Sequence, residues 1–331
     1  MSDGTDHDAR PVLALSGGVG GAKLALGLSR ALKPGALSVV ANTGDDFEHL
    51  GLHISPDIDT LTYALAGVDN RQTGWGRDNE TWSFMAAVGE LGGETWFKLG
   101  DRDLAVHVER TRRLKAGETL SAITAGIAAS FGVASRILPM SDDRVRTLVQ
   151  TRDGTLEFQR YFVESRCAPE VTGFVFDGAE RARPQPDILA MLGDPQLRAV
   201  IICPSNPYIS IDPILAMPEL RTALAAGAAP VIAVSPIIGG QAVKGPTAKM
   251  MTELGRTVDV LTVAEHYRGL IDGFIIDTVD APMASRLDVP ILARPVLMLN
   301  LADRENLAMA ALQFADRLAC AADRPARRNA R

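Results

Sequence analysis

Four aspartates are concentrated in one short stretch, NTGDDFEHLGLHISPDIDT, which spans residues 42–60. Carboxylates gathered near the ends of strands suit a hard cation such as Mg²⁺, which takes one or two carboxylates together with substrate phosphates. The same residue types allow another interpretation, in which Asp45 and Asp46 stabilise a turn and Asp57 caps the helix that it begins. Since only one aspartate is needed as that cap, Asp59 is the better candidate for chemistry. We therefore predict Asp45, Asp46 and Asp59 as metal ligands.

A glycine-rich stretch, LSGGVGGAKL at residues 15–24, follows an apolar run and precedes a helical pattern. It fits neither of the two familiar phosphate-binding fingerprints. The third glycine of the dinucleotide fingerprint falls on Lys23, and Ala22 stands where the P-loop requires a glycine before its lysine. The stretch therefore raises the question of which phosphorylated ligand, if any, it holds.

Three further polar stretches follow apolar runs and are candidates for ligand binding. KLGDRD, at residues 98–103, gathers opposite charges around a glycine. These charges would bind a phosphate and a metal or, alternatively, form a solvated salt-bridged turn that contributes little to stability. In CPSNPY, Ser205 and Asn206 would contact a nucleotide or, equally well, cap a helix. The turn at Gly239 exposes backbone N–H groups of the kind that cradle anions.

Other residue types carry a weaker chemical signal. The loop GWGRDNETW, at residues 74–82, places two tryptophans where they would cover an edge of the core or form one wall of a pocket for a flat heterocycle. The histidines show no metal-binding spacing, and His107 is interpreted as structural and given no role. No G-x-S-x-G nucleophile motif occurs in the sequence.

Apolar and polar runs alternate in the order that a parallel α/β sheet requires. Residues 11–17 and 37–46 predict strands, and residues 22–32 between them predict a helix, which makes a right-handed βαβ unit. Later buried strands are predicted at 199–206, 230–240, 270–280 and 289–298. The region 60–140 is mostly helical in pattern, and 145–164 alternates around an Asp-Gly turn as a hairpin does. We therefore predict one α/β domain with a Rossmann-like parallel sheet flanked by helices and with a helical and β-hairpin insertion.

Composition narrows the class of protein. The chain has 331 residues, 47% of them apolar, and a net charge of −6, which argues against nucleic acid as a partner. No apolar run approaches the roughly 18 residues of a membrane span, and the polar N-terminus is no signal peptide. The three widely separated cysteines predict reduced, buried thiols. We expect a soluble, cytoplasmic protein that binds neither nucleic acid nor membrane.

Eight motifs occur together and in order, and with them the sequence resembles the 2-phospho-L-lactate transferases of coenzyme F420 biosynthesis. They are LSGGVGGAKL, NTGDD, SPDIDT, GWGRDNETW, KLGDRDLAVHVERT, ILPMSDD, PSNPYISI and SPIIGGQAVKGP. The resemblance covers about residues 11–300, which predicts a single domain with flexible tails at 1–10 and about 320–331. A homodimer is an expectation from the family.

The resemblance implies a Mg²⁺-assisted phosphoester transfer. The acceptor would be the ribityl hydroxyl of 7,8-didemethyl-8-hydroxy-5-deazariboflavin (Fo), and the donor a guanosine 5′-diphosphate ester of phospholactate or phosphoenolpyruvate, with GMP released. In the family, the positions of Asp59 and Lys98 are associated with the deazaflavin, and we predict both as catalytic. Predicted substrate-binding residues are Gly17, Gly18, Gly20, Gly21, Lys23, Asp101, Arg102, Ser205, Asn206 and Gly239.

Two other functions are alternatives to this one. Relatives of the same fold resemble nucleotide-sugar-binding regulators, which we expect to lack LGDRD and PSNPxxSI; both motifs are present here. An NAD-dependent oxidoreductase would need the intact glycine fingerprint and an acidic residue about 20 positions on, and Asp45 comes too late. The sequence does not distinguish phospholactate, phosphoenolpyruvate and 3-phosphoglycerate as the transferred acid.

Overall fold

A seven-stranded, wholly parallel sheet forms the centre of the computed structural model, which describes residues 9–70 and 74–320. From edge to edge its strands are β14 (Ile291–Ala293), β13 (Gly273–Ile276), β10 (Val231–Val234), β9 (Ala199–Ile202), β1 (Val12–Ser16), β2 (Leu37–Ala41) and β5 (Arg136–Pro139). This order confirms the Rossmann-like fold predicted from the sequence. The strand β5 was missed, because it lies within the region expected to be mostly helical.

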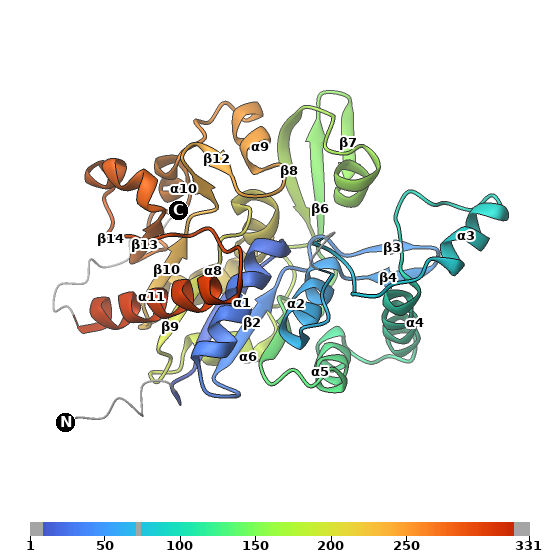
Figure 1. Ribbon diagram of the computed structural model, residues 1–331, viewed down its shortest axis with the longest axis horizontal. Coiled ribbons are helices and arrows are strands. Elements are labelled where there is room, and N and C mark those ends of the chain that lie inside the picture. The colour runs from blue at the N-terminus through green and yellow to red at the C-terminus, as the bar shows by residue number, and fades with distance from the viewer. Residues whose placement is uncertain (1–8, 71–73, 321–331) are drawn as a thin grey trace.

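Helices cover both faces of this sheet (Figure 1). Side chains alternate along β1, so that Val12 and Ala14 join one core while Leu13 and Leu15 join the other. The helices that pack on the first face are α1 (Gly18–Ala31), α2 (Pro56–Ala66), α5 (Leu120–Ser130) and α11 (Leu301–Cys320). Those on the second face are α6 (Pro186–Leu192), α7 (Asp212–Leu215), α8 (Pro218–Ala226), α9 (Thr247–Glu253) and α10 (Val260–His266).

The helix α11 lies beyond residue 300, where the predicted domain ended, and packs against α1 in the first core. The crossing is close, because a Cβ atom on Gly27 would collide with the backbone carbonyl of Arg304. Within α11, Leu307 and Leu312 are buried against this face of the sheet. The two predicted tails lie almost entirely outside the described residues.

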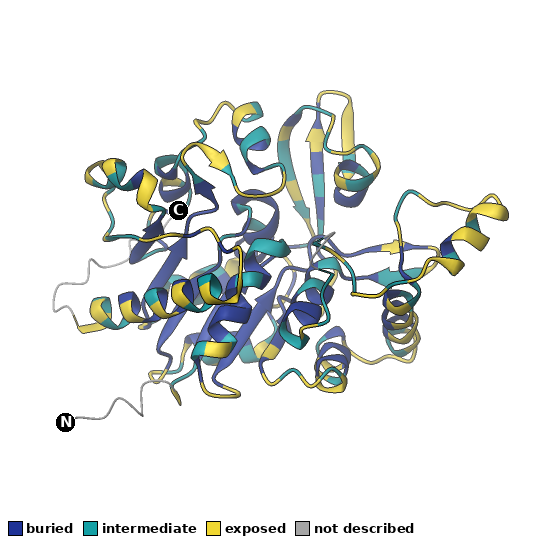
Figure 2. Cartoon of the chain, in the orientation of Figure 1, coloured by how far each residue is buried: buried dark blue, intermediate teal, exposed yellow. Residues whose placement is uncertain are grey.

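Part of the predicted insertion projects from the body of the molecule, on a ribbon that the sequence interpretation did not include (Figure 1). A two-stranded ribbon, β3 (Phe47–His49) and β4 (Leu52–Ile54), leads from the sheet towards α3 (Ser83–Glu90) and α4 (Asp101–Lys115). Figure 2 shows the contrast between the buried central sheet and the largely exposed α3. This arm therefore depends on its own small apolar cluster, which includes Phe47, Met85 and Leu99.

The predicted hairpin is present and has a third strand. β6 (Arg146–Thr151) pairs with β7 (Gly154–Glu157) around the Asp-Gly turn, and β8 (Val171–Asp177) pairs with the other edge of β6. Residues predicted to continue the hairpin instead form a π-helical turn, η2 (Arg160–Glu164). Smaller elements are β11 (Ile237–Ile238), β12 (Gln241–Ala242), the π-helical turn η3 (Pro207–Ile211) and the 3₁₀ helix η4 (Thr278–Arg286).

Two expectations from composition can be compared with the fold. All three cysteines are free thiols, but the prediction that they are buried holds only for Cys203, since Cys167 is half-buried and Cys320 is exposed. None of the helices in the described parts of the chain combines the length and hydrophobicity that crossing a membrane requires.

Candidate active site

Three loops meet at one edge of the sheet, where the strand order changes direction. β1 lies between β2 and β9, so the loops that follow these three strands are neighbours at their carboxyl ends. In open α/β sheets this point is the usual ligand-binding crevice. The buried Ser205 joins two of the loops, since its hydroxyl accepts from the Gly17 N–H (3.2 Å) and donates to the Gly17 carbonyl (2.8 Å).

The glycine stretch is the first turn of α1 rather than a separate loop. The helix begins at Gly18, four residues before the predicted start, and Gly17 occupies the cap position without a side-chain cap of its own. A Cβ on Gly21 would lie 2.6 Å from Ser205 Oγ and closer still to Ser16 Oγ, and one on Gly20 would overlap the Pro204 carbonyl. These glycines therefore let the helix terminus approach the two neighbouring loops.

Asp57 caps α1 instead of its own helix. Its carboxylate accepts from the Gly18 N–H (2.6 Å) and from Asn42 Nδ2 (3.0 Å). The cap position of α2 is Ser55, so the interpretation of Asp57 as the cap of the helix it begins is wrong. The helix α2 is thereby attached through its first turn to the glycine stretch.

Asp45 and Asp46 lie buried beside Asp57, in the turn after β2. Asp46 Oδ2 accepts from Ser55 Oγ (2.8 Å) and lies 3.1 Å from His53 Nε2. In the described part of the chain, several buried oxygens of this region have no hydrogen-bond partner: Ser16 Oγ, Thr43 Oγ1, Asp45 Oδ1 and Asp46 Oδ1. Buried oxygens are normally satisfied, so these atoms are the candidates in this region for contact with a ligand.

The raised pKa values of Asp45 and Asp57 also make this group a candidate for binding a ligand. Burial and the charge of Asp57 raise the pKa of Asp45 well above its ordinary value. Burial also raises the pKa of Asp57 to about 6, against the opposing effect of its hydrogen bonds from Gly18 and Asn42. Carboxylates that repel one another in a buried site favour a proton or a cation.

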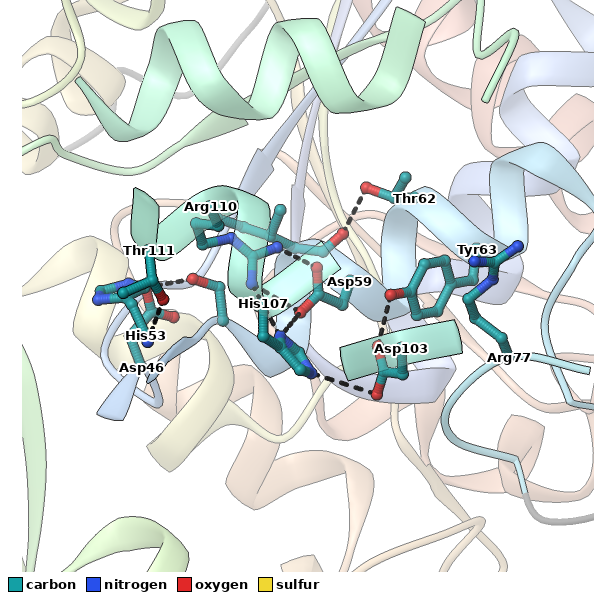
Figure 3. A network of polar contacts seen from close by, with 12 residues as sticks. Asp46, His53, Asp59, Thr62, Tyr63, Arg77, Asp103, His107, Arg110 and Thr111 are labelled. Atoms are coloured by element: carbon teal, nitrogen blue, oxygen red, sulfur yellow. Dashed lines mark hydrogen bonds and ion pairs between the residues drawn. The ribbon is translucent and has the colours of Figure 1, made fainter. Parts of the chain in front are cut away.

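Asp59 faces the opposite way along α2 and forms a buried ion pair with Arg110 of α4 (Figure 3). Arg110 Nη1 donates to Asp59 Oδ2 (3.1 Å), and Nη2 donates to Oδ1. His107 lies beside both, with Nδ1 3.6 Å from Asp59 Oδ2, and its Nε2 lies 3.3 Å from Asp103 Oδ2. Tyr63 donates to the other oxygen of Asp103.

Arg110 supplies the positive charge of this network. Burial lowers its pKa, but the adjacent Asp59 carboxylate outweighs that effect and raises it, so the guanidinium stays charged. Burial raises the pKa of Asp59, and Arg110 opposes the rise. Asp59, Asp103 and His107 form a buried group whose ligand atoms lie within 4.8 Å of one another, which is compact enough to hold a metal ion.

The residues of KLGDRD divide between structure and surface. Asp101 accepts from Thr81 Oγ1 (2.6 Å) and from the N–H groups of Ser83 and Phe84 (both 3.1 Å), so it caps α3. The side chains of Lys98 and Arg102 are exposed. Lys98 has no hydrogen-bond or ion-pair partner among the described residues, which leaves its ammonium group available.

The other predicted binding residues are arranged around the same edge. Lys23 donates to the Met298 carbonyl (2.9 Å), and burial together with Arg304 lowers its pKa. Asn206 caps the turn η3 by accepting from the Tyr208 N–H (3.0 Å), as the structural interpretation predicted. The Gly239 N–H is already donated to Asp280 (3.0 Å).

Arg110 is the residue that the sequence interpretation missed, and it lies beside His107, which was interpreted as structural and is buried. Their spacing from Asp103 places all three on one face of α4, at positions i, i+4 and i+7. Three polar residues in that register, on a face that also carries Val106, predict a buried polar network rather than a solvated surface.

The parallel sheet, the helix that starts at glycines and the buried acids at the switch point define a Rossmann-like α/β protein of the kind that binds phosphorylated ligands. The chain belongs to the CofD family: the model described as "2-phospho-L-lactate transferase CofD" matches residues 12–289. It is therefore a transferase of the type used in coenzyme F420 biosynthesis, as the resemblance implied.

Individual relatives agree with this assignment. A phosphoenolpyruvate transferase from Streptomyces griseus is 39% identical over 314 residues, covering 92% of this chain and 98% of the relative. A 2-phospho-L-lactate transferase from Methanosarcina mazei is 38% identical over 269 residues, covering 81% and 88%. A crystal structure of a UPF0052-family protein from Bacillus halodurans shares the fold, with a TM-score of 0.62 at 14% identity over 92% of this chain and 98% of that one.

Proposed function

We propose that this chain transfers a phosphorylated three-carbon acid from its guanosine 5′-diphosphate ester to the ribityl hydroxyl of Fo. The hydroxyl oxygen forms a bond to the phosphorus nearer the three-carbon acid, the bridging P–O bond breaks, and GMP leaves while the hydroxyl proton is released. The observation that carries the proposal is the group of buried acids with unpartnered oxygens, Asp45 and Asp46, beside the start of α1. Such transfers depend mainly on positioning and on stabilising charge, and no covalent nucleophile is needed.

The acids fit Mg²⁺. The unpartnered atoms are oxygens, which this cation prefers, and the neighbouring Asp57 adds a third carboxylate. We propose Asp45 and Asp46 as its ligands. When bound, Mg²⁺ would neutralise the negative charge that develops on the phosphoryl oxygens.

Asp59 serves the acceptor rather than the metal in this proposal. Both of its oxygens are engaged by Arg110, which already supplies a positive charge there. A carboxylate has lone pairs beyond those two contacts, so Asp59 still accepts a hydrogen bond from the ribityl hydroxyl and orients it. The exposed Lys98 would bind the deazaflavin on the outer side of the arm.

The donor would lie along the edge of α1. Gly17 and Gly18 use their N–H groups on Ser205 and Asp57, so the following N–H groups, including that of Gly20, are the ones that remain for a phosphate. Lys23, Ser205, Asn206 and Gly239 surround the same edge and are proposed to contact the diphosphate and guanosine. Phosphoenolpyruvate is the first acid to test, because the relatives that match 92% of the chain are named for it.

Nothing in the comparisons favours the alternative of a regulator, since the relatives named above are transferases. The test is turnover of the purified protein with Fo and Mg²⁺. Guanosine-diphosphate esters of the three acids are offered separately, and GMP and deazaflavin products are followed by mass spectrometry. Product from one donor establishes the reaction and its substrate. Absence of product from all three, in a protein that binds guanosine nucleotides, would favour the regulator.

A homodimer is proposed from the family, and light scattering tests it.

A further inference from the structure

We propose that Arg110 is a positioning residue for the transfer, which fixes the Asp59 carboxylate in the orientation that the acceptor hydroxyl requires. The inference rests on the proposed function, in which Asp59 receives that hydroxyl. In this proposal Arg110 acts through its contact with Asp59 and not by binding either substrate. No other buried arginine contacts Asp59 in the described part of the chain.

The contact between the two side chains leaves Asp59 little freedom. Two nitrogens of one guanidinium reach two oxygens of one carboxylate, and this forked geometry fixes the plane of the acid as well as its position. Arg110 is 1% exposed and Asp59 is 5% exposed, so little solvent reaches the pair. A lysine would hold Asp59 at a single point and would leave the carboxylate free to rotate.

Arg110 is itself fixed by residues on its own helix. Its Nη1 lies 3.3 Å from His107 Nδ1, and the far nitrogen of His107 lies 3.3 Å from Asp103. Tyr63, one turn after Asp59 on α2, donates to Asp103 and closes the network between the two helices (Figure 3). The contacts from His107 and Tyr63 restrict the rotation of Arg110 and Asp103.

Stability alone explains this pair poorly. Burying two charges costs about as much as their attraction returns, and apolar replacements of buried pairs are often neutral or stabilising. Arg110 Nε, moreover, has no hydrogen-bond partner within the described residues, so the desolvation of the guanidinium is only partly compensated. The pair therefore contributes little to stability, which fits a role in positioning Asp59.

The proposed metal ligand Asp46 is held from the same helix, α4, through a different residue. The next residue on α4, Thr111, accepts from the backbone N–H of His53, and His53 contacts Asp46. α4 therefore braces the proposed metal ligands through Thr111 and the acceptor acid through Arg110. A change at Arg110 should consequently affect the deazaflavin and leave donor and Mg²⁺ binding intact.

The test compares Arg110→Lys with Arg113→Lys in the full chain at saturating Mg²⁺. Arg113 lies on the same helix and forms an ion pair with Glu118 at the surface, so it is the matched control. We expect Arg110→Lys to lower kcat/KM for Fo by roughly 10- to 100-fold, the range for partners that orient a reactive group. The donor KM should stay within about twofold, and Arg113→Lys should change neither parameter.

A double-mutant cycle with Asp59→Asn separates positioning from a general structural effect. If Arg110 acts through Asp59, Arg110→Lys changes kcat/KM by less than about twofold in the Asp59→Asn background. Two results would overturn the inference. One is that the losses of kcat/KM multiply in the double variant, and the other is that kcat/KM falls equally for Fo and for the donor. If Arg110→Lys fails to fold, the double variant Asp59→Asn/Arg110→Gln, which buries no charged pair, replaces it. Its activity is compared with that of Asp59→Asn alone. Equal activity supports the positioning role of Arg110, and a further tenfold loss of activity refutes it.

Failure of the proposed function can be distinguished from failure of the positioning role of Arg110. Wild-type protein that forms no product with any donor contradicts the transfer reaction and leaves the contact between Arg110 and Asp59 to be tested by binding. Titration of Fo, followed by its fluorescence, then decides. Weaker binding in Arg110→Lys than in Arg113→Lys supports the positioning role, and equal binding refutes it.

Discussion

The carboxylate of Asp57 accepts a 2.6 Å hydrogen bond from the backbone N–H of Gly18, so a side chain of the protein itself occupies the N-terminus of α1. Helix N-termini stabilise negative charge, and a phosphate was predicted at this point. The same contact ties α2, with Asp59 two residues further on, to the loop where the donor is proposed to bind. The two proposed substrate sites are therefore connected through one helical turn.

The contribution of Asp57 to the stability of the metal-free protein should fall as pH rises through the pKa of this residue. Burial raises that pKa to about 6, so the native state holds a proton that the unfolded state releases near pH 4. The resulting stability is fully present below about pH 4 and is lost as pH rises through about 6, a change on the order of 3 kcal/mol. Denaturant unfolding in EDTA measures this loss. Saturating Mg²⁺ should reduce it, and an identical pH slope with and without Mg²⁺ would contradict the metal site.

Asp45→Asn should stabilise the metal-free protein at pH 8 and abolish transfer. The variant removes a carboxyl group whose ionisation is opposed by burial and by Asp57, which raise its pKa, so the unfolding midpoint without metal should rise. Mg²⁺ should no longer raise that midpoint, because a proposed ligand is lost.

The matched control for this variant is Asp153→Asn. Asp153 is exposed in the hairpin turn, so its replacement should leave midpoint, Mg²⁺ response and turnover unchanged. A lower midpoint for metal-free Asp45→Asn would show that the carboxylate is stabilising and that this account of the acids is incorrect.

Gly21→Ala should destabilise the protein by roughly 1–3 kcal/mol, the usual cost of overpacking. The new Cβ would lie 2.6 Å from Ser205 Oγ and would push α1 away from the loop after β9. Gly89→Ala is the control, since that helical glycine has 3.6 Å of room and alanine favours helices. Chemical unfolding of both variants checks the prediction, which equal stabilities would contradict.

Asp101→Ala should loosen the start of α3. The three hydrogen bonds that its carboxylate accepts include those from the Ser83 and Phe84 N–H groups. Losing such a cap costs about 1 kcal/mol, so exchange of these two amide protons should accelerate roughly fivefold. Asp142→Ala, which removes a contact to the Ser121 N–H of α5, should leave α3 unaffected. Unchanged exchange in Asp101→Ala, with weaker substrate binding, would indicate direct contact with substrate instead.

The sheet was predictable because buried parallel strands are continuous apolar runs that end in turn residues, as in VLALSG and AVIICPSN. The strand β5 escaped because RILP is short and follows helical segments. The start of α1 was placed late because glycines disfavour a helix, and here close packing against Ser16 and Ser205 overrides that preference.

The candidate site was predictable in residue type more than in contact. Asp45 and Asp46 were identified from their position after a strand, and both are buried there. The opposite orientations of Asp57 and Asp59 could not be predicted, because they depend on Gly18 and Arg110, residues far away in the sequence. Arg110 was missed because a charged residue in a charged helix normally lies at the surface.

The most direct test of the transfer itself follows the phosphorus atoms. A guanosine-diphosphate ester of phosphoenolpyruvate, labelled at the phosphorus nearer the acid, is incubated with the wild-type protein, Fo and Mg²⁺. We expect all transferred label to appear in the deazaflavin product, in a one-to-one ratio with unlabelled GMP. Label that stays with the released acid, with guanosine phosphate joined to Fo, would contradict the proposed site of attack. Failure to form any deazaflavin product from this or the other two donors would contradict the transferase function.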